Sequence, residues 1–551
     1  MSNDLQMTRR EVLGTASAAS GLALLGSPLT VMAQDALDKA VQAFRKVVGE
    51  QWVYTSAVSR DLYRDDYSPF SGTEQEPVPS AAVAPKSTEE VQRIVEICNQ
   101  HGIPFWVIST GKNLGFGGAA PMRSDMITLD LKRMNRIIEV NEKQAYAVVE
   151  PGVSFLDLYR HIQARGLKLW MTVPSPGWGS IIANSLEHGS GYGFQGDHIM
   201  SLCGLEVVLP TGELLRTGMG AMANASQAHN IKYSVGAHLD GLFAQSNLGV
   251  VTRAGYWLMP EPQAFACATI KVYGLEDLIP LVDLATQLRL KGAIGSSVRI
   301  GVGLTDLAHD PEFNRSALDA LVDPAEMQKA LLAAMQQKNL GAWHARMGFY
   351  GGPNLIRAQW EEVRTAYEQI PNVQFDYQQY EVPLANPEQL DVKTKLIAGV
   401  PSLADWVTNG RIEGHILNSP VLPADGESAL RAHRLAAEVH QEFGRAFGGA
   451  EMLSRTPREI LMTMGAEIFK SDPAANDVTI RLFKQLNVEF AKQGWGEIRA
   501  HPALMESVQN SYGWNNHAMR RVNEKLKDAL DPMGVMAPGK NGIYPRRMRP
   551  S

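Results

Sequence analysis

The spacing of apolar residues along the chain alternates between helical and strand periods. Apolar positions at helical spacing predict a helix over about residues 36–58. A second helix is predicted to begin at Ser87, because Ser87 and Glu90 form a capping pattern just before an amphipathic run that ends at Gly102. Short unbroken apolar runs predict strands at residues 81–85, 105–108, 126–131 and 145–150.

Further along, Gly152 is expected to open a helix that reaches Ile162, and residues 205–217 are typical of a strand, a turn and a strand. After Pro260 the pattern changes. Strands such as residues 266–272 then mix with amphipathic helices to about residue 500, and a long helix is predicted at residues 518–530. We therefore expect the α+β class, with domains at residues 36–262 and 263–500 and a C-terminal segment, 501–551, that packs back on the first domain.

The first 33 residues are typical of an export signal. Arg9 and Arg10 are followed by a weakly apolar run at residues 16–25, and Ala33 offers a small-residue cleavage site. We expect residues 1–33 to be a twin-arginine signal peptide and the mature protein to be periplasmic. A short anchor or an ordinary N-terminal helix is the alternative. The run is too short for about 30 Å of bilayer, and no other stretch predicts a membrane span.

Composition and charge exclude several classes. Of 551 residues, 45% are hydrophobic and 20% charged, which is typical of folded rather than disordered proteins. The net charge of −6 argues against general affinity for nucleic acid. Cys98, Cys203 and Cys267 lie far apart without a C-x-x-C pattern, so we expect no metal centre, no attached haem and no disulfide framework.

Two glycine-rich stretches indicate loops that approach a ligand closely. Residues 115–120 match G-x-G-x-x-A, but Pro121 and then a strand follow, whereas a Rossmann site needs a helix there. A loop between strands can still hold a pyrophosphate through its backbone amides. Residues 174–180 lead to a second glycine-rich stretch at 189–193. Either stretch alone could be a tight turn, but the pair favours a nucleotide cofactor.

Several motifs together resemble the vanillyl-alcohol oxidase and p-cresol methylhydroxylase flavoproteins, a family that includes 4-cresol dehydrogenase. The matching motifs are Gly111-Lys112-Asn113-Leu114-Gly115-Phe116-Gly117-Gly118, His188-Gly189-Ser190-Gly191-Tyr192, Gln245-Ser246-Asn247-Leu248-Gly249, Gly494-Trp495-Gly496-Glu497-Ile498-Arg499 and Ala537-Pro538-Gly539-Lys540. They span nearly the whole mature chain. The resemblance implies a two-lobed FAD-binding domain with an α+β cap domain over the flavin ring. It also implies oxidation of para-substituted phenols by hydride transfer to flavin, followed by addition of water.

The resemblance assigns most of the cofactor contacts to the glycine-rich stretches. The implied FAD-binding residues are Thr110, Gly111, Lys112, Asn113, Leu114, Gly115, Gly117, Gly179, Ser180, Asn184, Gly191, Tyr192, Val250, Val251, His415, Arg499 and Lys540. His415 matches the position that bonds covalently to flavin in some members. Others use a tyrosine a little upstream, where this chain offers only Trp406. A covalent bond from His415, a non-covalent flavin and a histidine that merely packs beside a strand all stay open.

The resemblance implies a catalytic set of Arg499, Ser175, Phe116 and Ile498, which would lie at the reacting end of the site, where the substrate meets the flavin. At three of these positions the chain departs from the family. Phenol-oxidising members hold the phenolate with two tyrosines and an arginine, but here Phe116 and Ile498 replace the tyrosines. Each missing hydrogen bond costs about 1–3 kcal/mol, which favours an apolar ring or alkene, unless another residue supplies the hydroxyl. Ser175 replaces an aspartate that acts as acid or base in oxidase members, and serine cannot take a proton at neutral pH.

The expected activity is that of an exported hydroxylating dehydrogenase acting on an apolar benzylic or allylic carbon. Phe116 and Ile498 also resemble relatives that hydroxylate a monoterpene such as limonene. We expect electrons to pass to a separate carrier such as a c-type cytochrome, and the protein to form homo- or hetero-oligomers. The alternatives are a 4-alkylphenol hydroxylase or oxidase and a non-catalytic flavin-binding protein.

Overall fold

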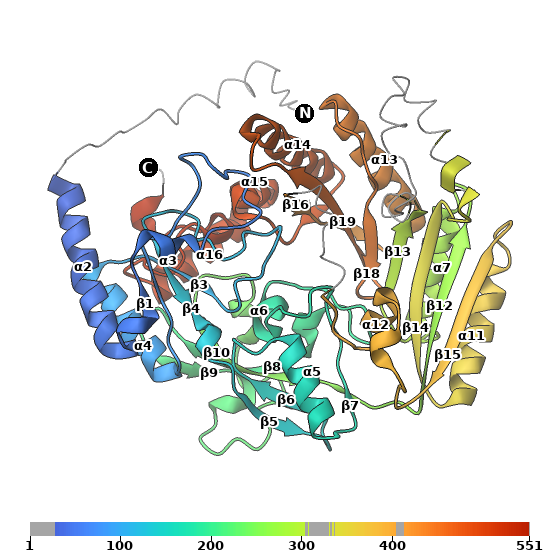
Figure 1. Cartoon of the computed structure of the whole chain (residues 1–551), viewed down its shortest axis with the longest axis horizontal. Coiled ribbons are helices and arrows are strands. Elements are labelled where there is room, and N and C mark those ends of the chain that lie inside the picture. The colour runs from blue at the N-terminus through green and yellow to red at the C-terminus, as the bar shows by residue number, and fades with distance from the viewer. Residues whose placement is uncertain are drawn as a thin grey trace.

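The computed structural model describes residues 28–549, except 304–306, 308–329, 331–332, 336 and 404–412. The twin-arginine motif at residues 8–14 and Trp406 lie outside the described residues. Figure 1 shows the N-terminal elements and a broad sheet as two lobes, with the C-terminal elements lying back beside the N-terminal ones. None of the helices in the described ranges combines the length and the apolar character that crossing a membrane requires.

The first sheet of the N-terminal lobe follows the order β1-β2-β4-β3. Its strands are β1 (Val53–Tyr54), β2 (Ala81–Val83), β4 (Ile127–Asp130) and β3 (Phe105–Ile108), and β4 runs parallel to both β2 and β3. The helices around it are α2 (Pro28–Val48), α3 (Ala57–Asp61) and α4 (Thr88–His101). Apolar residues of α2 and α4 join those of the strands in one core. The glycine-rich loop connects β3 to β4 at one end of this sheet.

The second sheet of this lobe is antiparallel, in the order β5-β6-β10-β8-β9. Its strands are β5 (Ile137–Asn141), β6 (Tyr146–Val149), β10 (Val250–Trp257), β8 (Leu202–Val208) and β9 (Leu214–Arg216), with helices α5 (Phe155–Ala164) and α6 (Ile181–Leu186) alongside. A separate apolar core lies between α5, α6 and these strands. The pair β7 (Leu169–Trp170) and β11 (Met259–Pro260) leads from here to the next lobe.

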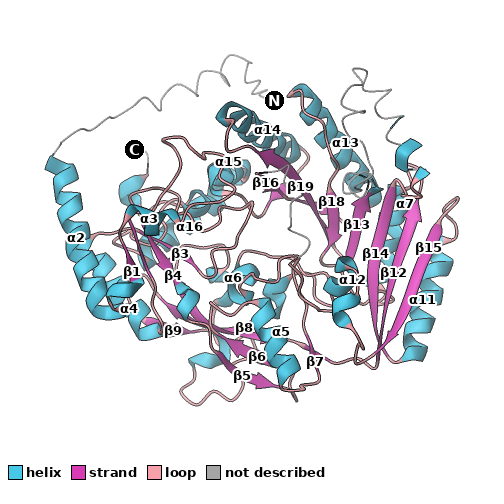
Figure 2. Cartoon of the chain, in the orientation of Figure 1, coloured by secondary structure: helices cyan, strands magenta, loops and turns pink. Residues whose placement is uncertain are grey.

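The cap lobe is built on one large sheet, ordered β15-β12-β14-β13-β18-β19-β17-β20, with β16 paired to β19. Its strands are β12 (Ala264–Val272), β13 (Val298–Val302), β14 (Trp343–Gly351), β15 (Gln374–Glu381), β16 (Gly414–Asn418), β17 (Pro420–Pro423), β18 (Glu451–Ser454), β19 (Glu459–Ile468) and β20 (Gly496–Glu497). Its helices are α7 (Leu278–Leu290), α11 (Pro353–Tyr367), α12 (Val392–Ile397), α13 (Gly426–Glu442) and α14 (Pro473–Lys492). Figure 2 shows these helices around the sheet.

The C-terminal segment contains α15 (Met505–Ser511) and α16 (Trp514–Leu530) and then contacts β3. The Phe105 N–H donates to the carbonyl of Val535 at 2.8 Å, and the Ala537 N–H donates to the carbonyl of Phe105 at 2.7 Å. The side chain of Asn247 donates to the carbonyl of Ala537 at 3.0 Å. The chain end therefore extends the edge of the first sheet.

Sequence periodicity placed α4 correctly but misjudged two other helix ends. The Ser87 hydroxyl accepts from the Glu90 N–H, and Gly102 ends α4 in the left-handed conformation, with φ of 67°. The helix expected at residues 36–58 is wrong at its end, because it stops at Val48 and is followed by Gly49 at φ of 91°. The expected helix start at Gly152 is also wrong, because Ser154 forms the capping box of α5.

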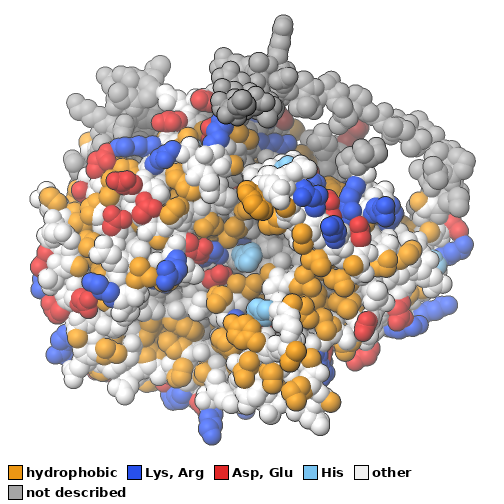
Figure 3. Space-filling view, turned by 180° about the vertical axis from the view of Figure 1, so that it is seen from behind, with side chains coloured by type: hydrophobic (Ala, Val, Ile, Leu, Met, Phe, Trp, Pro, Cys, Tyr) orange, Lys and Arg blue, Asp and Glu red, His pale blue; other side chains and the backbone are white. Residues whose placement is uncertain are grey.

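The surface mixes charge and apolar area. On the face shown in Figure 3, Lys and Arg side chains are interspersed with Asp and Glu around the periphery. The same face is hollowed near its centre, where histidine side chains are visible between apolar ones.

Candidate active site

A large cleft lies between the N-terminal lobe and the cap sheet. Its walls come from the β3–β4 loop, residues 174–192, the start of β10, the cap strands β16, β18 and β19, and the C-terminal segment. The cavity volume is about 320 Å³, which lies within the range of about 300–1,000 Å³ that small-molecule sites occupy.

The β3–β4 loop supplies one long edge of the cleft. Gly115 and Gly117 have φ of 79° and 106°, in the region that favours glycine. A Cβ on Gly117 would lie 2.6 Å from the ring of Pro502, so the backbone packs too closely for any side chain. Within the loop, the N–H groups of Phe116 and Gly118 both donate to the Asn113 carbonyl at 3.0 Å. No helix follows the loop, as its sequence context predicts.

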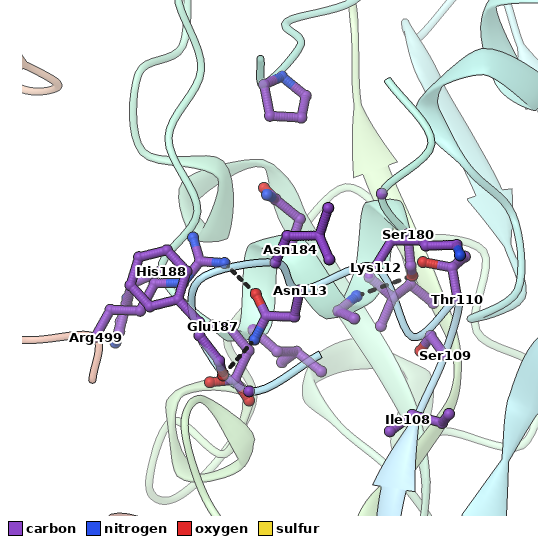
Figure 4. Close-up of a pocket in the computed structure, with 18 of the residues that line it drawn as sticks. Ile108, Ser109, Thr110, Lys112, Asn113, Ser180, Asn184, Glu187, His188 and Arg499 are labelled. Carbon is purple, nitrogen blue, oxygen red and sulfur yellow. Dashed lines mark hydrogen bonds between the residues drawn. The ribbon is translucent and has the colours of Figure 1, made fainter. Parts of the chain in front are cut away.

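The second glycine-rich stretch forms the opposite edge. Ser180 caps α6 by accepting from the Ala183 N–H at 3.1 Å, and its hydroxyl donates to the Pro151 carbonyl at 2.6 Å. Asn184 pairs with the ring of His198 at 2.6 Å. Figure 4 shows Thr110, Ser109 and Ser180 together at one end of the pocket and Arg499 with His188 at the other. The two stretches therefore face one elongated site.

Most of the residues predicted for the cofactor line this cleft. They are Thr110, Gly111, Lys112, Asn113, Leu114, Gly117, Gly179, Ser180, Asn184, Tyr192, Val250, Val251, Arg499 and Lys540. The predicted residues Gly115, Gly191 and His415 are absent from the lining. Gly115 instead backs onto His415, whose ring would lie 3.1 Å from a Cβ placed there. All four predicted catalytic residues, Phe116, Ser175, Ile498 and Arg499, line the cleft.

Several polar groups in the lining have no protein partner. Buried Trp178 Nε1, Ser246 Oγ and Arg499 Nε make no hydrogen bond in the structure. Buried polar groups of this kind are normally satisfied. Together with Lys112, these groups are donors of the kind that bind the phosphates and polar ring edges of FAD. The residues present therefore fit the cofactor, which supplies a hydride acceptor when it is bound.

Lys540 reaches the cleft from the C-terminal segment and pairs there with Glu187. Burial alone raises the pKa of Glu187, but the neighbouring Lys540 ammonium lowers that pKa below its ordinary value. The Glu187 carboxyl is therefore ionised at neutral pH. Lys540 Nζ also lies 5.8 Å from the centre of the Trp106 ring.

Arg499 occupies the reacting end. Its guanidinium donates to the Asn113 amide oxygen at 2.6 Å, and its Cζ lies 4.1 Å above the centre of the Phe116 ring. Burial lowers the pKa of Arg499 to about 10, against the effect of nearby Glu187 and Glu497. The arginine therefore remains a cation at neutral pH, stacked on an aromatic face that carries no hydroxyl.

Glu497 lies behind Arg499 and fixes its backbone. The carboxylate accepts from the Ser419 N–H and, at 3.0 Å, from the Arg499 N–H. Burial raises the pKa of Glu497 to about 8 despite these bonds. Glu497 therefore holds its proton more strongly than an ordinary carboxyl, and the Arg499 cation beside it opposes that effect.

His415 lies beside the glycine loop on the same face of β16 as the cleft-lining Leu417, because side chains alternate along a strand. Its ring lies 4.9 Å from that of Tyr67, centre to centre. Burial lowers the pKa of His415 to about 4, partly offset by Asp65. The imidazole is therefore neutral at pH 7, with a nitrogen lone pair.

Known proteins similar to this chain are FAD-dependent flavoproteins. Residues 79–218 match a family model described as an FAD binding domain. The 4-cresol dehydrogenase [hydroxylating] flavoprotein subunit of Pseudomonas putida is 30% identical over 517 residues, covering 93% of this chain and 96% of that protein. The chain belongs to the p-cresol methylhydroxylase family of FAD-dependent oxidoreductases. This confirms the predicted family, cofactor and enzyme class.

Solved structures place the p-cresol methylhydroxylase fold over nearly the whole chain. Substrate-bound p-cresol methylhydroxylase matches with a TM-score of 0.85 and 30% identity, covering 93% of this chain and 98% of that one. The isoeugenol complex of 4-ethylphenol oxidase from Gulosibacter chungangensis matches with a TM-score of 0.85 and 34% identity, covering 94% and 98%. The predicted α+β fold, an FAD-binding domain with a cap, is confirmed.

Sequence reasoning missed part of the lining. The cap wall contributes Leu417, Ser419, Glu451, Leu453, Leu461 and Thr463, and the N-terminal lobe adds Trp178, Glu187, His188 and Ser246. His188 begins a recognised motif and Glu187 precedes it, so both could have been included. The cap residues carry no local signal, because strand pairing alone brings them to the cleft.

Proposed function

We propose that this member of the family is an exported hydroxylating dehydrogenase that removes hydride from an apolar benzylic or allylic carbon and adds oxygen from water. A monoterpene such as limonene, oxidised to perillyl alcohol, is the proposed substrate type. The observation that carries the proposal is the reacting end of the cleft, where Phe116 and Ile498 flank Arg499. We propose transfer of electrons to a separate carrier protein.

The energetics support an apolar substrate. A phenolate at this end would find Arg499 but no hydroxyl on Phe116 or Ile498, at a cost of about 1–3 kcal/mol for each lost hydrogen bond. The cap wall adds Leu417, Leu453 and Leu461 to the lining of the same cleft. Removal of water from these side chains favours a ring or alkene that has no polar group to satisfy.

Export and a separate carrier are supported by the sequence. The motif at residues 8–14 resembles a twin-arginine signal. That route usually moves proteins that are already folded, which supports loading of the cofactor before export. The chain contains no C-x-x-C-H haem motif, so a cytochrome would be another polypeptide. Reduction of added cytochrome c without oxygen tests this proposal, whereas hydrogen peroxide release in air would contradict it.

A second candidate, a 4-alkylphenol hydroxylase or oxidase, is favoured by the retained Arg499 in the cleft and by the similarity to 4-ethylphenol oxidase. The two candidates separate in an anaerobic assay with holoenzyme. Limonene-type alkenes are expected to bleach the oxidised flavin, and bleaching by 4-alkylphenols alone would overturn the apolar proposal. A protein that no substrate bleaches would be a non-catalytic flavin binder.

A covalent flavin bond from His415 is part of the proposal. The neutral ring faces the same side of β16 as the cleft-lining Leu417. We expect acid-precipitated wild-type protein to retain its yellow colour in the pellet and the His415→Ala pellet to be colourless. The exposed His238→Gln variant is the control and should stay yellow. A colourless wild-type pellet would exclude the bond while leaving the fold assignment intact.

A further inference from the structure

The cap sheet brings a carboxylate to the cleft whose role the family comparison does not assign. Among the described residues that line the cleft, two are acidic, Glu187 and Glu451. Glu187 is paired with Lys540. Glu451 begins β18, opposite Thr463 of β19, and the next cleft-lining pair along the two strands is Leu453 with Leu461. Glu451 is thus the acidic group of an otherwise mainly apolar wall.

Glu451 is held in place by two neighbours. The Nε and one terminal nitrogen of Arg299 both bind its Oε2, and the Tyr192 hydroxyl donates to its Oε1 at 3.2 Å. The Arg299 guanidinium also lies 5.3 Å from the centre of the Tyr192 ring. The Glu451 side chain is 26% exposed and lines the cleft.

We propose that Glu451 is the catalytic group that receives the proton of the water that adds to the oxidised carbon. The inference rests on the proposed function. Ser175 lines the same cleft but cannot hold a proton at neutral pH. Tyr192 and Arg299 act as positioning residues, because they fix the direction of the carboxylate.

The step balances without a further reactant. Hydride leaves the carbon with its electron pair for the flavin, and a lone pair of water forms the new C–O bond. One water proton passes to Glu451 and the other stays in the product hydroxyl. Glu451 then releases its proton to solvent. A protonated alcohol is a far stronger acid than a carboxylic acid, so even a carboxylate paired with arginine is basic enough to take this proton.

The test separates hydride removal from water addition. Holoenzyme of the wild type and of Glu451→Gln is mixed without oxygen with a substrate that bleaches the wild-type flavin, in water labelled with oxygen-18. Two quantities are measured in one turnover, the rate of bleaching and the labelled alcohol formed per flavin reduced. We expect bleaching within about threefold of the wild type and a fall in labelled alcohol of about tenfold or more.

Two further variants make the result decisive. Glu381→Gln removes an exposed carboxylate from the same sheet and should change neither quantity. If Glu451→Gln loses its flavin, Glu451→Asp is measured instead. It keeps a charge for Arg299 but withdraws the carboxylate by one methylene, so the alcohol yield should again fall.

The outcomes distinguish the two proposals. An unchanged alcohol yield in the Glu451 variant, with a bleached wild type, overturns the role of Glu451 alone. An equal fall in bleaching rate and alcohol yield also overturns it, because that result indicates a purely structural role. A wild-type flavin that neither alkenes nor phenols bleach overturns the proposed function itself.

Discussion

At the scale of single residues, the proposed function assigns substrate selection to Phe116 and Ile498. Arg499 is already positioned by Asn113 and stacked on Phe116, so new hydroxyls would be added beside an existing cation. We expect Phe116→Tyr with Ile498→Tyr to raise kcat/KM for 4-ethylphenol relative to limonene by about 10- to 100-fold for each hydrogen bond gained. Ile498→Leu is the size control and should leave the ratio near the wild-type value. An unchanged ratio in the double variant would show that these positions do not select the substrate.

The same two residues show what sequence could reveal at this scale. Phe116 and Ile498 were identified from their motif neighbours, and both line the cleft. Glu451 and Leu461 were missed. The sequence of an antiparallel strand does not tell which of its side chains face a ligand, and this becomes clear only when the register with the neighbouring strand is known.

At the scale of elements, the β3–β4 loop is the part most constrained by backbone geometry. We expect Gly117→Ala to lower both the melting temperature and the flavin content, because its Cβ would lie 2.6 Å from Pro502. Gly166→Ala is the matched control, since Gly166 also has a positive φ, 61°, but has open space around it. In this control the free energy of unfolding should fall only by about 1–2 kcal/mol, the cost of a left-handed backbone for a residue with a Cβ, and the flavin should remain bound. Equal effects of the two substitutions would contradict the account of the loop.

The ends of a helix could be predicted from the sequence where capping residues were present. The Ser87 cap and Gly102 made α4 predictable, and the helix predicted at residues 518–530 matches the regular part of α16, which follows left-handed residues 515–517. The end of α2 was misplaced, because apolar residues continue after Gly49 into β1 and mimic helical spacing. The positive φ of Gly49 ends the helix although the helical spacing of apolar residues continues beyond it.

At the scale of the whole molecule, the C-terminal segment closes the cleft from a distance in sequence. Lys527 is fully buried, pairs with Asp531 at 2.7 Å, and donates to the Asn247 carbonyl at 2.8 Å. We expect Lys527→Ala to destabilise the fold by about 3–5 kcal/mol, because Asp531 is left buried without its cation. Exposed Lys525→Ala on the same helix should change stability little. Urea unfolding of the two variants measures the difference, and similar midpoints would refute a stabilising role for this pair.

The most direct measurement for the account as a whole is the anaerobic rate of flavin bleaching in the first turnover, compared between limonene and 4-ethylphenol at equal saturation. A cleft that ends in Phe116, Ile498 and a leucine-rich cap wall predicts faster bleaching by limonene. Rapid bleaching by 4-ethylphenol with none by limonene would contradict it.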